Sequence, residues 1–234
     1  MIGSSAADIV DVPLGIDLAA VALGGLSGAV VAVRHGFDLG GILVLSIVTG
    51  LGGGILRDTL LQRGTPVALT SPWLLPVAIA AGCVVALFSE SLATDAKWTG
   101  AMYVVLDAGF LAVYASVGTA KALDAGLPAV TCVLLGVATG TGGGLLRDVV
   151  VNTQPDLLRP GTLLVSAAAV GAAVEVLMVR QVGFSRSAGY ISIVVVVSLR
   201  LVSVWRGWES PRPTDVRRAA RRYAKGSADG ASKT

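Results

Sequence analysis

The chain has 234 residues, 54% of them hydrophobic and 14% charged, with a net charge of +3 and a mean hydropathy of +0.78. These values exclude an ordinary soluble domain and predict an all-α protein that crosses a membrane several times. The alternative, a soluble all-α protein with a very large core, is disfavoured by uncharged runs over 64–89 and 125–146, because about 20 apolar residues span a bilayer. A single histidine, His35, argues against a histidine-rich metal site and a Ser-His-Asp triad.

Seven apolar spans are expected, and we divide the chain around them. Residues 1–13 lack the basic region of a cleavable signal peptide, so the first span is expected to stay in the protein. The third span begins at Trp73, an aromatic residue suited to the membrane interface. The predicted parts are an N-terminal segment over 1–13, a first three-helix repeat over 14–90, a second over 98–180, a seventh helix over 187–205 and a basic tail over 206–234.

A glycine cluster followed by arginine and aspartate lies inside the second span and again inside the fifth. Residues 50–58 read Gly-Leu-Gly-Gly-Gly-Ile-Leu-Arg-Asp, and residues 140–148 read Gly-Thr-Gly-Gly-Gly-Leu-Leu-Arg-Asp. Glycine costs about 1 kcal/mol relative to alanine in a helix interior, so each cluster predicts a kink or break. The kink positions are Gly50, Gly52, Gly53 and Gly54 in the second helix and Gly140, Gly142, Gly143 and Gly144 in the fifth.

Broken helices deep in lipid are tolerated only where their free backbone groups face protein or water. The paired breaks therefore predict a hydrophilic pore, lined by the hydroxyls of Ser46, Thr49, Thr139 and Thr141. Close helix packing is the alternative interpretation of these glycines, and it is the preferred one for Gly24, Gly25, Gly28 and Gly118.

Charged residues beside the glycine clusters need partners in an apolar environment. We expect one ion pair between Arg57 and Asp17 and another between Arg147 and Asp107. The alternative is that these side chains extend to the membrane interfaces. The charged residues predicted near the pore are Asp17, Arg57, Asp58, Asp107, Arg147 and Asp148.

The two halves of the chain match when the sequence is shifted by 90 positions. Asp17 then falls on Asp107 and Thr49 on Thr139, in register with the glycine motifs. Because each half contains three spans, an odd number, the second half enters the membrane from the opposite side. The pattern predicts 3+3 inverted-topology repeats plus a seventh helix outside the symmetry.

Orientation follows from the positive charge of the tail. Residues 206–234 contain eight Lys or Arg and three Asp or Glu, which favours a cytoplasmic C-terminus and an N-terminus outside the cell. Within the tail, residues 215–225 suit a basic helix on anionic lipid, although a solvated tail is the favoured interpretation. The sequence gives little support for a nucleic-acid partner.

The doubled motif in a chain with seven spans resembles the prokaryotic TRIC (trimeric intracellular cation) channels, which contain two glycine-transporter-type domains. The resemblance implies a homotrimer in the cytoplasmic membrane, in which each protomer has its own pore for monovalent cations, with K+ favoured. It implies no cofactor, although K+ or Na+ would pass through the pore. It does not extend to the lipid-binding lysine motif of the animal members, because the matching stretch reads Gly-Gly-Gly-Ile-Leu-Arg.

Other function classes stay open beside the cation channel. Inverted repeats also favour an alternating-access transporter of a small solute such as glycine. A structural membrane protein without transport is a third interpretation. An enzyme is disfavoured, because the glycine clusters lack the Lys-Ser/Thr of a phosphate-binding P-loop.

Overall fold

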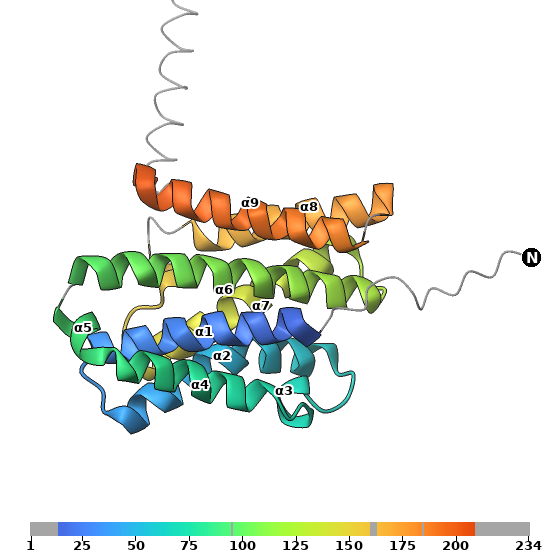
Figure 1. The fold of residues 1–234 in the computed structure, drawn as a ribbon. Coiled ribbons are helices and arrows are strands. Elements are labelled where there is room, and N and C mark those ends of the chain that lie inside the picture. The colour runs from blue at the N-terminus through green and yellow to red at the C-terminus, as the bar shows by residue number, and fades with distance from the viewer. Residues whose placement is uncertain (1–13, 95, 160–162, 184, 209–234) are drawn as a thin grey trace, which may run out of the picture.

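The computed structural model describes residues 14–94, 96–159, 163–183 and 185–208. The N-terminal segment 1–13 and the proposed basic helix over 215–225 lie outside these ranges. The described elements are all helical (Figure 1). They are α1 (Leu14–Arg34), α2 (Leu39–Leu61), α3 (Val67–Thr70), α4 (Leu74–Leu87), α5 (Ser89–Thr94), α6 (Ala96–Asp124), α7 (Ala129–Val150), the 3-10 helix η2 (Asp156–Leu158), α8 (Leu164–Val182) and α9 (Ser185–Arg206).

Matching turns separate the first two helices of each half. The turn after α1 contains Gly36 with a φ angle of +69°, and the turn after α6 contains Gly126 with a φ angle of +70°. Glycine adopts this left-handed conformation without steric cost, which is why it commonly ends helices. Asp38 then caps α2, because its side chain accepts a hydrogen bond from the backbone N–H of Gly41 at 2.8 Å.

Six of the described helices are long and apolar enough to cross a bilayer, namely α1, α2, α6, α7, α8 and α9. The third predicted span is helical only over the 14 residues of α4, about 21 Å at 1.5 Å per residue, whereas the apolar core of a bilayer is about 30 Å thick. Pro72 contributes to this short length. It follows Ser71 at the end of α3, and a proline disfavours helical geometry at the residue before it.

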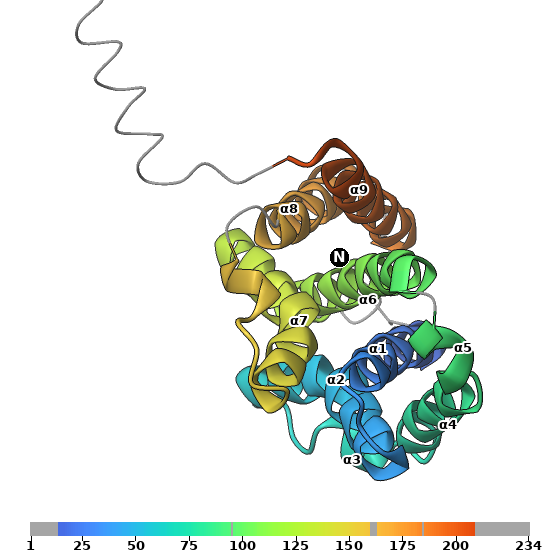
Figure 2. The same ribbon diagram turned by 90° about the vertical axis from the view of Figure 1, so that its left-hand side faces the viewer.

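The helices of each half pack on one another, and the halves meet along two helix pairs. α1, α2 and α4 form one group, and α6, α7 and α8 form the other; α1 contacts α6, and α2 contacts α7 (Figure 2). α9 packs on the outside of α6 and α8. α1 and α6 run in opposite directions, because Asp17 near the start of α1 contacts Lys121, whereas Ser27 further along α1 contacts Asp107.

The glycine clusters lie where α2 and α7 touch, and the expected interruption of the helices is wrong. Both helices are continuous through their clusters. A Cβ atom on Gly53 would collide with the carbonyl oxygen of Thr139, and one on Gly143 would collide with that of Thr49. The glycines therefore allow the two backbones to come into contact, and this packing offsets their low helix propensity. A bend of either helix axis stays a prediction.

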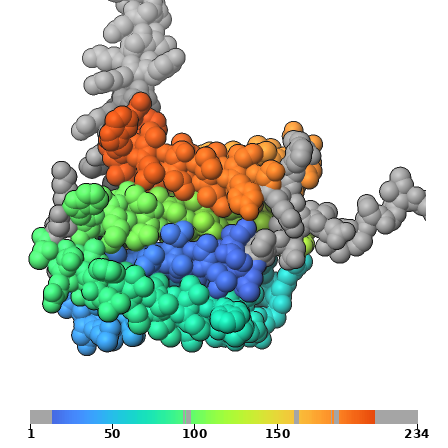
Figure 3. Space-filling model, viewed as in Figure 1, coloured from blue at the N-terminus to red at the C-terminus, as the bar shows by residue number. Residues whose placement is uncertain are grey.

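The outer surface is apolar, whereas several charged side chains lie inside. Figure 3 shows the face formed by α9, α6, α1 and α4. Large hydrophobic side chains are exposed on the described helices, among them Trp98 of α6, which is 76% exposed. Arg57, Arg147 and Glu175 are each at most 2% exposed. This inverted distribution suits a protein surrounded by lipid, where apolar side chains face outward and charges must be paired inside.

Candidate functional site

The first buried ion-pair cluster lies between α1, α2 and α6. Arg57 projects from α2 one helical turn after Gly53. Its Nη1 donates to Asp17 Oδ1 at 3.2 Å and its Nε donates to Asp58 Oδ1 at 2.7 Å, while Lys121 Nζ lies 3.3 Å from Asp17 Oδ2. We call Arg57, Asp17, Asp58 and Lys121 the Arg57 cluster. It places two cations against two carboxylates.

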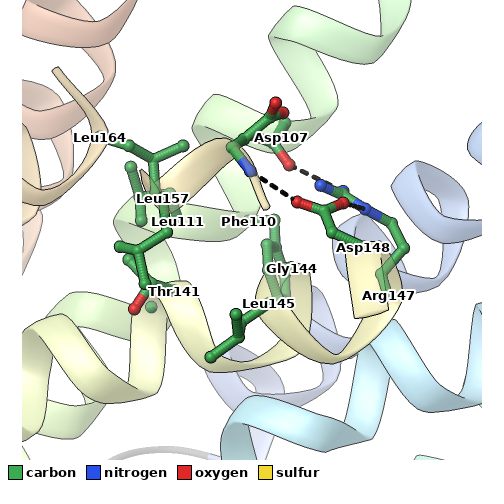
Figure 4. Close-up of a pocket in the computed structure, with 12 residues that line it drawn as sticks. Asp107, Phe110, Leu111, Thr141, Gly144, Leu145, Arg147, Asp148, Leu157 and Leu164 are labelled. Atoms are coloured by element: carbon green, nitrogen blue, oxygen red, sulfur yellow. Dashed lines mark hydrogen bonds and ion pairs between the residues drawn. The ribbon is translucent and has the colours of Figure 1, made fainter. Parts of the chain in front are cut away.

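The second buried cluster lies between α1, α6 and α7. Arg147 Nη1 donates to Asp107 Oδ1 at 3.0 Å, and Nε donates to Asp148 Oδ1 at 2.9 Å (Figure 4). Nη1 also donates to Ser27 Oγ at 3.0 Å. Its Nη2 donates to the hydroxyl of Tyr103 at 3.0 Å, and the guanidinium carbon lies 5.2 Å from the centre of the Tyr103 ring. We call these five residues the Arg147 cluster. All three guanidinium nitrogens are engaged.

The predicted pairs of Arg57 with Asp17 and of Arg147 with Asp107 are both confirmed. The alternative, in which the arginines extend to the membrane interfaces, is wrong, since Arg57 is 2% exposed and Arg147 is 1% exposed. A charge buried in this way is tolerated only when it is paired and hydrogen-bonded. Removing one partner of such a pair costs about 3–5 kcal/mol.

Each cluster is also attached to the short helix that follows its arginine helix. Asp58 Oδ2 accepts a hydrogen bond from the backbone N–H of Val67 at 2.9 Å, at the start of α3. Asp148 Oδ2 accepts one from the backbone N–H of Asp156 at 2.8 Å, at the start of η2 (Figure 4). A shift of either arginine is thereby coupled to the loop beside it.

The two clusters differ in their access to space outside the protein. An open cleft of about 390 Å³ borders Asp17, Asp58 and Lys121, and Arg63 Nη1 bonds Asp124 Oδ2 across 2.7 Å at its rim. The cavity beside Asp107, Arg147 and Asp148 measures only about 10 Å³, close to the minimum that holds one water molecule. The Arg57 cluster therefore borders a cleft, whereas the Arg147 cluster has room for about one water molecule beside it, and we call it closed in that sense.

The predicted pore hydroxyls are buried, and each donates to a backbone carbonyl. The hydroxyls of Thr49 and Thr139 face α1 and α6, and that of Ser46 faces α4, whereas the carbonyls of Thr49 and Thr139 face the contact of α2 with α7. Thr49 and Thr139 donate to the carbonyls four residues earlier, at 2.7 and 2.6 Å. Ser46 donates to Ala78 O at 2.7 Å, and Thr141 donates to Val137 O at 2.8 Å. Of the predicted kink glycines, Gly140 and Gly144 border the small cavity beside Arg147, as does Thr141. The hydroxyl oxygens keep lone pairs, so they can still act as acceptors.

Three polar partners were not predicted from the sequence. Lys121 contacts Asp17 across 104 positions, Tyr103 contacts Arg147 across 44, and Ser27 contacts Arg147 across 120. They fall outside the repeat, because the positions 90 residues away hold Val31, Pro13 and Val117. The 90-residue shift aligns the aspartates of the two halves, but it aligns none of these three residues with a residue of the same kind, so it could not predict them.

Both clusters consist of paired charges, and neither has the ligand set of a metal centre among the described residues. Within the described ranges, no group of three or more His, Cys, Asp or Glu side chains is placed to hold a metal ion. Asp17, Asp58, Asp107 and Asp148 are each paired with Arg or Lys. Charges held in a poorly polarisable interior act strongly on any ion that approaches them.

The sequence matches one protein family twice and is similar to bacterial membrane proteins. A model of the family described as glycine transporter matches residues 14–90 and again residues 104–180. A UPF0126 membrane protein of Deinococcus radiodurans is 35% identical over 190 residues, which cover 80% of this chain and 86% of that protein. The UPF0126 inner membrane protein YadS of Escherichia coli is 31% identical over 200 residues, which cover 85% of this chain and 94% of that protein.

The fold also matches solved structures. The TRIC trimeric intracellular cation channel orthologue from Rhodobacter sphaeroides aligns with a TM-score of 0.76 at 28% sequence identity, over 82% of this chain and 97% of that one. The family match occurs once in each half, and the structural match covers nearly the whole of a known channel. The chain therefore belongs to the prokaryotic TRIC (trimeric intracellular cation) channel family, with two glycine-transporter-type repeats.

Proposed function

We propose that this protein is a cation channel of the cytoplasmic membrane that favours K+, assembled as a homotrimer with one hydrophilic path in each protomer. The observation that carries the proposal is the pair of buried ion-pair clusters on either side of the glycine contact between α2 and α7. The likeness to solved TRIC cation channels supports it further. Such buried charges are costly in lipid and mark ion pathways in membrane proteins.

The proposed path runs between α2 and α7, past the glycines of both motifs. In this arrangement the contact of Gly53 with Gly143 is the narrowest point, and the path is closed there and at the Arg147 cluster. Opening requires α2 and α7 to bend or separate at their glycines, which removes the backbone contact. The backbone carbonyls of Thr49 and Thr139, which face this contact, then replace part of the hydration shell of the ion.

The membrane arrangement is part of the proposal. α1, α2 and α4 form one inverted repeat over residues 14–90, and α6, α7 and α8 form the other over residues 98–180; α9 lies outside the symmetry. The opposite directions of α1 and α6 support this arrangement. α4, the third predicted span, counts as a short crossing and brings the number of crossings to seven. The N-terminus lies outside the cell, and the basic tail lies in the cytoplasm.

One observation favours a second candidate, an alternating-access transporter of a small solute such as glycine. The protein has an open cleft at the Arg57 cluster and a closed interior at the Arg147 cluster. A transporter that exposes its site to one side of the membrane at a time has this asymmetry.

Recording from purified protein in planar bilayers distinguishes the two candidates. A channel gives unitary currents in symmetrical KCl, smaller ones in NaCl, and a reversal potential that follows the cation gradient. Gly53→Leu should abolish these currents, because the new side chain meets the Thr139 carbonyl. Gly15→Leu is the matched control, since a Cβ at Gly15 meets no atom within 4 Å. Saturable glycine uptake into proteoliposomes without unitary currents would instead establish the transporter.

A further inference from the structure

A third buried polar group lies between α6, α8 and α9, apart from both ion-pair clusters. Glu175 on α8 is 2% exposed, and Ser116 on α6 and Ser192 on α9 are also buried. We call these three residues the Glu175 cluster. At the position 90 residues before Glu175, the first half has the buried apolar residue Val85. The repeat fold therefore does not require a carboxyl group here.

The oxygens of this cluster converge, and some of them have unused hydrogen-bonding capacity. A Cβ on Gly189 would lie 3.2 Å from Ser116 Oγ and 3.7 Å from Glu175 Oε1, so the missing side chain leaves room beside both oxygens. Ser116 Oγ also donates to the Gly189 carbonyl at 3.4 Å. Among the described residues, three buried side-chain atoms have no hydrogen-bond partner, namely Glu175 Oε2, Ser192 Oγ and, further along α9, Arg200 Nε.

None of the ion pairs among the described residues includes Glu175. Arg200 is the basic residue of α9 nearest in sequence to Ser192 on its C-terminal side, and it lies eight positions on, about 12 Å along the helix. Of the other charged side chains that the structure describes on the packed elements, the following have partners elsewhere: Asp107, Lys121, Asp124, Arg147, Asp148, Asp156 and Arg180. Arg206, in the last turn of α9, lies over the ring of Trp208. An unpaired carboxylate at this depth would cost several kcal/mol, so its charge must be neutralised by something that binds.

We propose that Glu175, Ser116 and Ser192 form a site that binds one small monovalent cation, a proton or a sodium ion, between α6, α8 and α9. Carboxyl, hydroxyl and carbonyl oxygens are the donors that such sites use within membranes. The site ties α9, the helix outside the repeats, to α6 and α8 of the second half. Cation binding there stabilises this three-helix contact, and it does so independently of the conduction path.

Thermal unfolding of the full chain in detergent tests the site. The midpoint is measured by tryptophan fluorescence from pH 5.5 to 8.5, with NaCl exchanged for choline chloride at constant ionic strength. Binding that saturates the site about a hundredfold above its Kd raises the midpoint by roughly 5–10 °C. A rise with NaCl identifies sodium as the ligand, and a rise only at lower pH identifies the proton. Glu175→Gln should remove that response, and the same response in both proteins would overturn the proposal.

Two further variants separate the site from general packing on α9. Ser192→Ala should weaken the response to the cation, whereas Ser203→Ala should keep it, because Ser203 is another buried serine of α9, 11 positions further along. If Glu175→Gln fails to fold, the native protein decides the question by mass spectrometry after treatment with dicyclohexylcarbodiimide, which modifies protonated carboxyl groups in apolar surroundings. Modification at Glu175, whether or not NaCl suppresses it, supports the site; an unmodified Glu175 across the whole pH range overturns it.

Discussion

The Arg57 and Arg147 clusters contain the same sequence motif but have different surroundings. Both contain an arginine, the aspartate that follows it and an aspartate from the first helix of the same half. Around Arg147, the hydroxyls of Tyr103 and Ser27 accept the remaining hydrogen bonds, and the cavity beside the cluster measures about 10 Å³. Around Arg57, Lys121 adds a second cation, and a cleft of about 390 Å³ lies alongside.

Residues outside the repeat contribute to this difference. The repeated residues place a paired arginine on either side of the glycine contact. Tyr103 and Lys121, which have no counterparts in the repeat, give the two arginine clusters different additional partners. In the proposed channel, the Arg147 cluster is accordingly the closed end of the path, and the Arg57 cluster is its entrance.

Replacing either arginine should destabilise the protein more than the other substitutions considered below. Arg147→Ala leaves Asp107 and Asp148 buried without their cation, and we expect it to lower the free energy of unfolding by about 3–5 kcal/mol. Arg57→Ala should cost about 1–3 kcal/mol, since Lys121 and water in the cleft still stabilise Asp17. Denaturant unfolding in detergent measures both variants. Equal losses would show that the two clusters are equally accessible.

Tyr103→Phe should weaken the Arg147 cluster, with a loss of stability between those of the arginine and lysine variants. The variant keeps the ring but loses the hydroxyl that accepts from Arg147 and donates to Asp156 at 2.8 Å. We expect a loss of about 1–2 kcal/mol in unfolding free energy and a larger fraction of time open in bilayer recordings. Tyr190→Phe on the exposed face of α9 is the control. An unchanged open fraction would place the barrier to ions at another point.

Lys121→Gln should change the charge at the cleft and have a smaller effect on stability than the substitutions above. Lys121 is partly exposed, at 23% of its side chain, so its ion pair contributes no more than about 1 kcal/mol. Removing its positive charge beside Asp17 should raise the cation conductance in 50 mM KCl. The gain should fade in 1 M KCl, where the Debye length is about 3 Å. A gain that persists at high salt would point to a change of shape.

The residues of the two motifs were easier to predict than the conformation of their backbone. The 90-residue shift paired Arg57 with Asp17 and Arg147 with Asp107 because buried charges have few acceptable partners. The prediction that these glycines break the helices is wrong. Glycine permits both a break in a helix and a close approach of two helices. Which of the two occurs depends on whether another helix lies against the glycine, as α7 lies against Gly53 through the carbonyl of Thr139.

The membrane class, the duplication and the two ion pairs could be predicted from the residues alone, because hydropathy, periodicity and the cost of burying charge act on the residues directly. Three other features become visible only in the folded protein: α2 and α7 touch at their glycines, α4 is short, and one cluster is closed while the other borders a cleft. These features depend on contacts such as that of Lys121 with Asp17, 104 positions apart. No local pattern encodes the distance between two helices that meet only after the chain has folded.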